Sequence, residues 1–269
     1  MSTASDSQRA LLQRLIEVLG ADDRVESAWL SGSFGRGAGD IWSDIDVTVV
    51  VDEEDLPHCV GEYGGVRNPV GETVVLYTLY GRVISAVRPD WERYDLVFAT
   101  VPEFRTHDKA ALKPLALASL EAPTPAPREP KPYQPSADAL GAMAQEFLRI
   151  LGLLPVAAGR GEWLAAQEGV GLMRKALIEM MMEANGIGRG QRGGAKRLNP
   201  FLTDPQRQAV EAIPPAGADR ESLLVANQAL AALFLPLAKD TLAKAGAPWP
   251  QALEDATRAH LARTVGLTL

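Results

Sequence analysis

The fold prediction for this chain starts from residues 30–51, whose sequence is LSGSFGRGAGDIWSDIDVTVVV. The glycines and serines at its start predict a tight turn after a strand, and the apolar run at its end predicts a buried strand. Asp44 and Asp46 stand two residues apart, so their side chains share one face of that strand, while Ile45 and Val47 point the other way. Two carboxylates on one face repel each other unless a cation lies between them. The stretch therefore predicts a cation site at the start of a core strand.

The length and composition of the chain favour two domains and a small substrate. At 269 residues the chain exceeds the usual size of one domain and is long enough to bury a sizeable core. Its formal net charge is -7, so it offers no broad basic surface for a nucleic-acid backbone. A nucleic acid is therefore not an expected partner, and a small, cationic substrate fits the acidic balance better.

Cysteine and histidine usage argues against two kinds of site. Cys59 is the only cysteine, so no disulfide can form within the chain, and His58, His107 and His260 are too scattered for a zinc-ligand pattern. Residues 1–9 are polar and lack the apolar segment of a signal peptide, and no run reaches the ~18 uninterrupted apolar residues of a membrane span. We therefore expect a cytoplasmic protein in a reducing compartment, with no membrane partner.

The first half of the chain predicts a helix followed by short strands. Apolar residues at helical spacing predict an amphipathic helix over residues 7–19, with Ser5 or Asp6 as its cap and Gly20 as its stop. Apolar and β-branched runs predict five strands, over residues 25–31, 43–51, 72–80, 82–87 and 94–99. Gly81 separates two of these strands and indicates a hairpin or two consecutive strands of one sheet.

A proline-rich segment, residues 121–135, is the predicted boundary between two domains. Prolines at nearly every second or third position exclude a helix or a central strand there. We expect a catalytic domain over residues 1–120, this linker, and an all-helical domain over residues 136–269. Helical signals are clearest at residues 161–184, 203–213, 219–245 and 250–265. Pro236 is expected to kink or interrupt the third of these helices.

Two common phosphate-binding motifs are excluded by the spacing of the glycines. A P-loop needs lysine and then serine or threonine after Gly37, but Ala38 and Gly39 stand there. A dinucleotide fingerprint that begins at Gly35 and Gly37 needs a third glycine where the chain has Asp40.

A different motif survives this exclusion. It consists of the Gly32-Ser33 turn with Arg36-Gly37 behind it, the segment Ser43-Asp44-Ile45-Asp46 entering a buried strand, and Asp95 near the start of a later strand. Over about residues 25–100 this pattern resembles the signature of the nucleotidyltransferase superfamily with the DNA polymerase beta type of catalytic core.

The predicted division into a sheet domain and a helical domain is similar to that of the antibiotic-modifying members of the superfamily. Examples are the nucleotidyltransferases that act on aminoglycosides in antibiotic resistance. The resemblance implies an α+β fold, with a small mixed β-sheet and flanking helices followed by an all-α helical bundle.

The resemblance also implies a Mg²⁺-dependent transfer reaction. A nucleoside monophosphate, AMP when ATP is the donor, would pass from a nucleoside triphosphate to a hydroxyl of a small acceptor, and pyrophosphate would leave. Two Mg²⁺ ions would stabilise the charge that builds on the phosphate oxygens, and Mg²⁺ takes oxygen ligands. We therefore predict Asp44, Asp46 and Asp95 as metal ligands and catalytic residues.

Four residues of the first domain are predicted to contact the nucleotide. Gly32 lets the backbone approach the triphosphate, and Ser33 offers both an N–H and a hydroxyl. Arg36 would neutralise phosphate charge or pin the turn to the sheet. Ser43 belongs to the matched motif. As a structural alternative, Ser33 is an ordinary helix cap.

A basic, glycine-rich loop in the second half supplies a fifth nucleotide contact. We predict that Lys196 contacts the leaving pyrophosphate when this loop closes. Its basic neighbours are Arg189, Arg192 and Arg197. A solvated loop without a function is the alternative.

The identity of the general base stays open. Asp95 would either share a metal or accept the proton of the acceptor hydroxyl. Asp90 and Glu92 precede the strand of Asp95 and are weaker substitutes, and Glu162 and Glu168 are candidates from the helical domain.

Alternative functions also stay open at this point. The same core could transfer the nucleotide to a protein side chain or an RNA end, although the acidic balance and the lack of interleaved aromatic and basic residues argue against RNA. It could also bind a nucleotide without turnover, as an antitoxin-like regulatory module would. The oligomeric state and the preferred base are not predicted. Trp91, Trp163 and Trp249 are expected to be core or domain-interface anchors.

Overall fold

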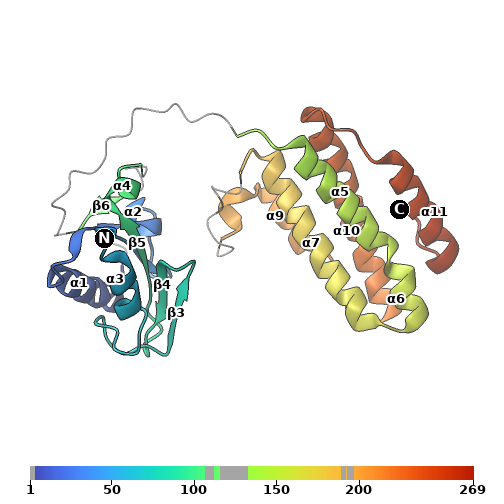
Figure 1. Cartoon of the computed structure of the whole chain (residues 1–269). Coiled ribbons are helices and arrows are strands. Elements are labelled where there is room, and N and C mark those ends of the chain that lie inside the picture. The colour runs from blue at the N-terminus through green and yellow to red at the C-terminus, as the bar shows by residue number, and fades with distance from the viewer. Residues whose placement is uncertain (1–3, 107–111, 116–132, 189–191, 193–196) are drawn as a thin grey trace. The chain divides into compact units, whose positions relative to one another are not determined.

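The computed structural model of the chain describes residues 4–106, 112–115, 133–188, 192 and 197–269. The chain divides into two compact units, residues 1–129 and 130–269 (Figure 1). The division falls inside residues 121–135, the segment predicted as a linker, most of which lies outside the described residues. Each unit has a hydrophobic core of its own.

The first unit contains a six-stranded mixed sheet in the order β3-β4-β5-β2-β1-β6. The strands are β1 (Val25–Leu30), β2 (Ile45–Val51), β3 (Val75–Leu79), β4 (Val83–Val87), β5 (Arg93–Thr100) and β6 (Lys113–Pro114). β2 and β5 pair in parallel, and the other four neighbouring pairs are antiparallel. The predicted mixed sheet is confirmed, with each of the five predicted strands present and β6 added at its edge.

The helices of the first unit are α1 (Asp6–Gly20), α2 (Gly32–Gly35), α3 (Leu56–Tyr63) and α4 (Val101–Phe104). The first three contribute to the main core on one face of the sheet, whereas Phe104 of α4 packs with Trp29 and Val50 on the other face. α1 begins where the sequence predicts, because the Ser5 hydroxyl accepts the Gln8 N–H and the Gln8 side chain accepts the Ser5 N–H. α3 was not predicted; Pro57 in its first turn suits a helix start, and Cys59 and Tyr63 are its buried residues.

Alternation along the strands separates the core face from the open face. In β5, Tyr94 and Leu96 are fully buried in the core that α1 and α3 share, whereas Asp95 between them lies on the opposite face and is half-buried. In β2, Ile45 enters the same core and Asp46 lies on the opposite face. The acids thus stand on the face that α1 and α3 leave uncovered.

β3 and β4 form the predicted hairpin. Tyr80 and Gly81 occupy its turn with φ of 51° and 68°, and the Leu79 carbonyl accepts the Arg82 N–H at 3.1 Å. Positive φ at both central positions is the turn geometry that matches the twist of two antiparallel strands.

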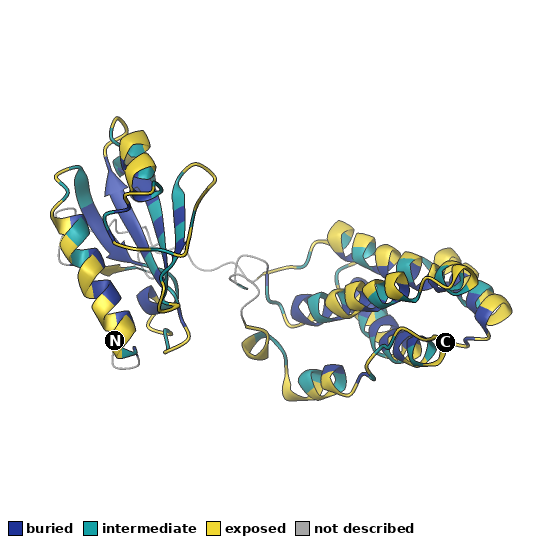
Figure 2. Ribbon diagram, turned by 90° about the horizontal axis from the view of Figure 1, so that it is seen from below, coloured by how far each residue is buried: buried dark blue, intermediate teal, exposed yellow. Residues whose placement is uncertain are grey.

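The described part of the second unit is helical, as predicted. Its helices are α5 (Ala137–Gly152), α6 (Leu154–Arg160), α7 (Trp163–Ala184), α9 (Asp204–Glu211), α10 (Arg220–Lys244) and α11 (Gln251–Val265), with the 3-10 turn η2 (Asn199–Phe201). Their buried stripes meet in one core, in which Phe147 stacks on Phe234 with ring centroids 3.8 Å apart. Figure 2 shows these stripes as dark blue bands that alternate with exposed residues along each helix.

The structure decides one alternative for a helix and corrects one expectation for a tryptophan. α10 continues through Pro236, so of the expected kink or interruption the interruption does not occur, and Phe234 and Leu235 on the preceding turn are buried in the core. Trp91 is 76% exposed at a φ of 64°, so it is not a core anchor. Trp163 and Trp249, by contrast, pack against the core of the second unit.

Two helical stretches of the second unit, Ala137–Arg160 and Arg220–Lys244, are long and apolar enough to cross a membrane by length and composition alone. In the structure their apolar residues, including Leu148, Leu151 and Leu230, are fully buried in the core of this unit. Packing within the unit accounts for their apolar character.

Candidate active site

The pairing of β2 with β5 brings the three predicted acids together. Asp46 and Asp95 are direct partners in this parallel pair, and Asp44 precedes Asp46 on the same side. One carboxylate oxygen from each of Asp44, Asp46 and Asp95 lies within 4.8 Å of the others, and all three residues are half-buried. Over the described ranges this is the one cluster of acidic, histidine or cysteine side chains close enough to hold a metal ion.

The Gly32 turn lies directly against one of these acids. The backbone N–H of Ser31 donates to the Asp46 carbonyl at 2.8 Å, and Gly32 follows with a φ of 57°. A Cβ added at Gly32 would stand 1.7 Å from Asp46 Oδ2, far inside contact distance. Glycine is therefore required both by the backbone conformation and by the carboxylate beside it.

Ser33 carries a polar atom that lacks a partner. Its Oγ is inaccessible to solvent and makes no hydrogen bond among the described residues. Because a buried hydroxyl is ordinarily paired, this atom marks a place that a bound group can complete. Ser33 does not cap α2; Ser31 holds the cap position without a side-chain hydrogen bond.

Ser43 has a structural task in the turn before the acids. Its hydroxyl donates to Asp40 Oδ1 at 2.9 Å and accepts the Asp40 N–H at 3.0 Å. Trp42, inside this turn, donates its N–H to Asp40 Oδ1, and its carbonyl accepts Arg93 Nη2 at 2.6 Å. The backbone of Trp42 is thereby fixed while its ring is 78% exposed. A nucleotide contact of Ser43 stays a prediction.

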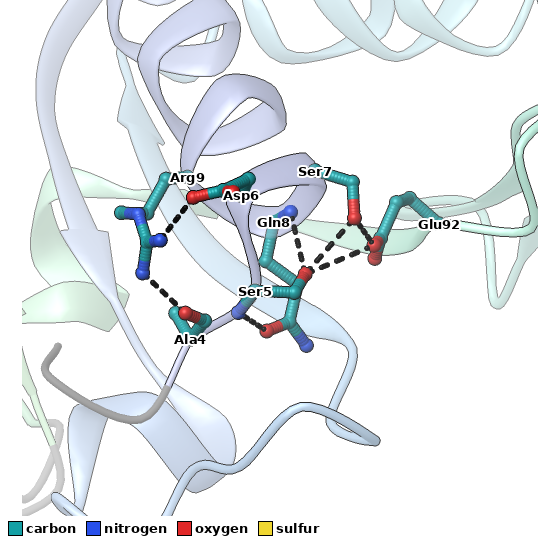
Figure 3. Close-up of polar contacts among 7 residues, drawn as sticks. All are labelled: Ala4, Ser5, Asp6, Ser7, Gln8, Arg9 and Glu92. Atoms are coloured by element: carbon teal, nitrogen blue, oxygen red, sulfur yellow. Dashed lines mark hydrogen bonds and ion pairs between the residues drawn. The ribbon is translucent and has the colours of Figure 1, made fainter.

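The first turn of α1 contacts the segments that lead into the two acid-bearing strands, and the sequence did not predict this role. Gln8, 0% exposed, donates through Nε2 to the carbonyls of Ser43 and Asp40, at 2.7 and 3.1 Å. The hydroxyls of Ser5 and Ser7 both bond Glu92, which directly precedes β5 (Figure 3). The Ser-x-x-Gln capping signal at residues 5–8 was present in the sequence, but nothing in it indicates these distant partners.

The other predicted site residues fall into three groups. Arg36 is exposed and forms no ion pair with any residue that the structure describes. Of the weaker acids, Asp90 lies 3.6 Å from Arg88 and Glu92 is held by the serines of α1. Lys196 lies outside the described residues.

The candidates from the second unit have neighbours of their own. Arg192, expected in the basic loop, is paired with the buried Glu183, which also accepts the Tyr133 hydroxyl at 2.6 Å. Glu162 and Glu168 line a cavity of about 330 Å³ between α5, α6 and α7. Their role as general base stays a prediction.

On the open face of the sheet, a row of cross-strand partners extends from Asp46 and Asp95 across two more strands. Cross-strand pairing aligns Asp46, Asp95, Ser85 and Tyr77, from β2 through β5 and β4 to β3. Directly paired residues project to the same face, so Ser85 and Tyr77 extend the row of acids. Tyr77 is 48% exposed.

Comparison with known proteins identifies the segment that holds the turn and the first two acids. Residues 12–89 match the family model of the nucleotidyltransferase domain. No curated protein sequence matches the chain. Among solved structures, the chain is similar to an aminoglycoside 6-adenyltransferase from Bacillus subtilis, with 14% identity, a TM-score of 0.46, and coverage of 95% of this chain and 98% of that chain. A similarity at this level carries no argument about fold or substrate.

Proposed function

We propose, from the match of residues 12–89 to the family model of the nucleotidyltransferase domain, that the protein is a Mg²⁺-dependent nucleotidyltransferase. It would transfer a nucleoside monophosphate, AMP from ATP, to a hydroxyl of a small acceptor and release pyrophosphate. The observation that carries the proposal is the convergence of Asp44, Asp46 and Asp95 beside the Gly32 turn.

The acid cluster fits hard divalent cations. Three carboxylates within 4.8 Å supply the oxygen ligands that Mg²⁺ prefers, and they leave further positions for phosphate oxygens and water. Bound Mg²⁺ would supply charge stabilisation for the phosphate oxygens and lower the pKa of the attacking hydroxyl. Without a cation, three carboxylates this close would repel one another.

The Gly32-Ser33 turn is the proposed site of the triphosphate. Its backbone lies against Asp46 without a side chain in between, so phosphate oxygens can approach both the turn and the metal ligands. The unpartnered Ser33 hydroxyl would donate to a phosphate oxygen. Arg36 is exposed near this turn and would add positive charge.

We further propose that the acceptor binds on the other side of the acids, because the displacement is in line. The Gly32 turn follows β1, so a pyrophosphate held there leaves toward the β1 side of Asp46. The attacking hydroxyl must approach the phosphorus from the opposite side, where β5 carries Asp95 and β4 and β3 carry Ser85 and Tyr77. In this proposal Asp95 would accept the proton of the acceptor hydroxyl.

The test is pyrophosphate release from each nucleoside triphosphate with Mg²⁺ and a panel of aminoglycosides. We expect release that depends on one acceptor class and that falls at least a hundredfold in Asp46→Asn, because the substitution removes one charged metal ligand. Asp23→Asn is the matched control, since Asp23 is exposed in the turn after α1 and lies outside the acid cluster. Equal activity of wild type and Asp46→Asn would refute the metal assignment.

Two outcomes would favour the alternatives. Labelling of lysate proteins by ATP without transfer to any small acceptor would indicate a protein substrate. Thermal stabilisation by ATP and Mg²⁺ with no pyrophosphate release on any acceptor would indicate a module that binds nucleotides without turnover.

A further inference from the structure

We propose that the first turn of α1 positions the metal-binding acids, and that Gln8 is its principal positioning residue. This inference rests on the proposed function, because it assumes that Asp44, Asp46 and Asp95 bind metal. It concerns the side chains of Ser5, Ser7 and Gln8, none of which belongs to the acid cluster.

Gln8 holds the turn that leads into Asp44. Its Nε2 donates to the carbonyl of Ser43, the residue directly before Asp44, and to the carbonyl of Asp40 at the other end of the turn. The amide of one glutamine thus spans the start and the end of the turn over residues 40–43. With the side chain fully buried, no water replaces these bonds when the amide is removed.

Helix capping alone does not explain this arrangement. The capping box needs the Gln8 carbonyl oxygen, which accepts the Ser5 N–H at 2.8 Å. It makes no use of the two N–H groups of the side chain, which both donate to a segment more than thirty residues away. The side chain therefore performs a second task beyond capping the start of the helix.

The serines of the same turn hold the other acid-bearing strand. Ser5 Oγ donates to Glu92 Oε1 at 3.3 Å, and the Ser7 hydroxyl bonds the same oxygen (Figure 3). Glu92 directly precedes β5, three residues before Asp95. One helical turn thereby fixes the points at which both parallel strands begin, and with them the separation of Asp44 from Asp95.

Metal affinity is the property that this geometry controls. If the ligand carboxylates are no longer held close together, part of the binding free energy is used to bring them into position when the ion binds. In known sites the loss of an outer positioning group weakens metal binding by about tenfold to a hundredfold. Gln8 acts through the backbone, so we expect the lower end of this range.

The experiment measures Mn²⁺ affinity of the full chain by titration calorimetry and by the electron paramagnetic resonance of free Mn²⁺. Gln8→Glu keeps the capping acceptor and adds a negative charge in the first turn, where the helix dipole favours one, but it removes the amide donor to Ser43 and Asp40. Gln8→Met removes both the capping acceptor and the amide donor. We expect the Mn²⁺ dissociation constant to rise about tenfold in both variants.

Two controls separate positioning from loss of stability. Gln13→Met changes an exposed glutamine on the same helix, whose Nε2 bonds only the exposed Glu17 among the residues described. Leu19→Ala deletes buried side-chain volume at the far end of α1 and lowers stability without touching the turn. Both controls are expected to keep the wild-type Mn²⁺ affinity at temperatures where the chain is folded.

The outcomes separate this inference from the proposed function. Wild-type Mn²⁺ affinity in folded Gln8→Glu and Gln8→Met would overturn the positioning role, and so would an equal loss of affinity in Leu19→Ala. If the wild type binds no Mn²⁺, or if Asp46→Asn binds it as tightly, the metal assignment itself fails and this inference falls with it.

Discussion

At the scale of single residues, Gly32 and Asp46 form the tightest constraint in the candidate site. Gly32 has a left-handed backbone, and its missing Cβ is what lets the Asp46 carboxylate approach the turn. Any other residue at this position would push the carboxylate away from the other two acids of the cluster. The contact between Gly32 and Asp46 therefore links the proposed phosphate-binding turn directly to one of the proposed metal ligands.

Gly32→Ala is therefore expected to damage the site more than the fold. The left-handed backbone costs an alanine about 1–2 kcal/mol, and the new methyl group would displace Asp46. Gly37→Ala is the matched control, because Gly37 also has a positive φ, of 77°, but a Cβ there would meet only Lys113 Nζ at 3.5 Å. Both variants should lose similar stability in urea unfolding, and only Gly32→Ala should lose Mn²⁺ binding. Equal Mn²⁺ binding in the two variants would contradict the prediction.

Cys59 is expected to be inert in the native protein. Burial raises the pKa of its thiol to about 11, although the nearby Arg24 guanidinium opposes the shift. Since the thiolate is the reactive form, the folded chain should react slowly with a disulfide reagent at pH 8, and one thiol per chain should react at once in guanidinium. Cys59 is the only cysteine in the chain, so the reaction with the reagent reports on this thiol alone. Fast reaction of the native protein would show that α3 opens readily.

At the scale of elements, the parallel pairing of β2 with β5 creates the site. Local patterns predicted both strands and placed Asp44 and Asp46 on one face, because alternation follows from the strand itself. The register that makes Asp46 and Asp95 partners depends on long-range packing, so the sequence could suggest the third acid only through the family resemblance. The contacts of Gln8 with residues 40 and 43 were beyond local patterns for the same reason.

The β3-β4 hairpin is expected to contribute to acceptor binding. In the row that begins with Asp46 and Asp95, Tyr77 presents a half-exposed ring on the side from which the acceptor would approach. Tyr77→Ala should raise the KM for the acceptor about fivefold to tenfold, the loss of roughly 1 kcal/mol of ring contact, and leave the KM for ATP unchanged. Tyr80→Ala removes an exposed tyrosine in the turn of the same hairpin and serves as the control. A rise in the KM for ATP instead would place the nucleoside, not the acceptor, on this hairpin.

At the scale of the whole molecule, each unit must maintain its own core, and the second unit relies on a buried carboxylate. Glu254, 1% exposed, accepts Lys239 at 2.7 Å, Arg258 at 2.8 Å and Trp249 Nε1 at 2.6 Å. Burial alone would raise its pKa, but the hydrogen bonds from Lys239, Arg258 and Trp249 outweigh burial and lower it. These contacts tie α10 to α11 and to the segment between them.

The pH dependence of unfolding follows from this lowered pKa. A carboxylate whose folded pKa is depressed contributes its full stabilisation above its unfolded pKa, about 4.3, and loses it as the pH falls through the folded value. Glu254→Gln should cost about 1–3 kcal/mol at pH 7, since its cationic partners are partly exposed. It should also flatten the fall in stability below pH 4. Urea unfolding at pH 7 and pH 3.5 measures the loss of stability and its pH dependence. An unchanged pH profile in Glu254→Gln would exclude Glu254 as the source of the fall in stability at low pH.

The Tyr80-Gly81 turn has a practical consequence for protein engineering. It closes the hairpin beyond Leu79 and Val83, toward the end of β5 that is remote from Asp95. Its two central residues already adopt a conformation that glycine and asparagine accept, and the Tyr80 side chain is almost fully in solvent. An epitope, a fluorophore or a surface tether can therefore be inserted here, giving a form of the protein that is immobilised at the end of the hairpin remote from Asp95.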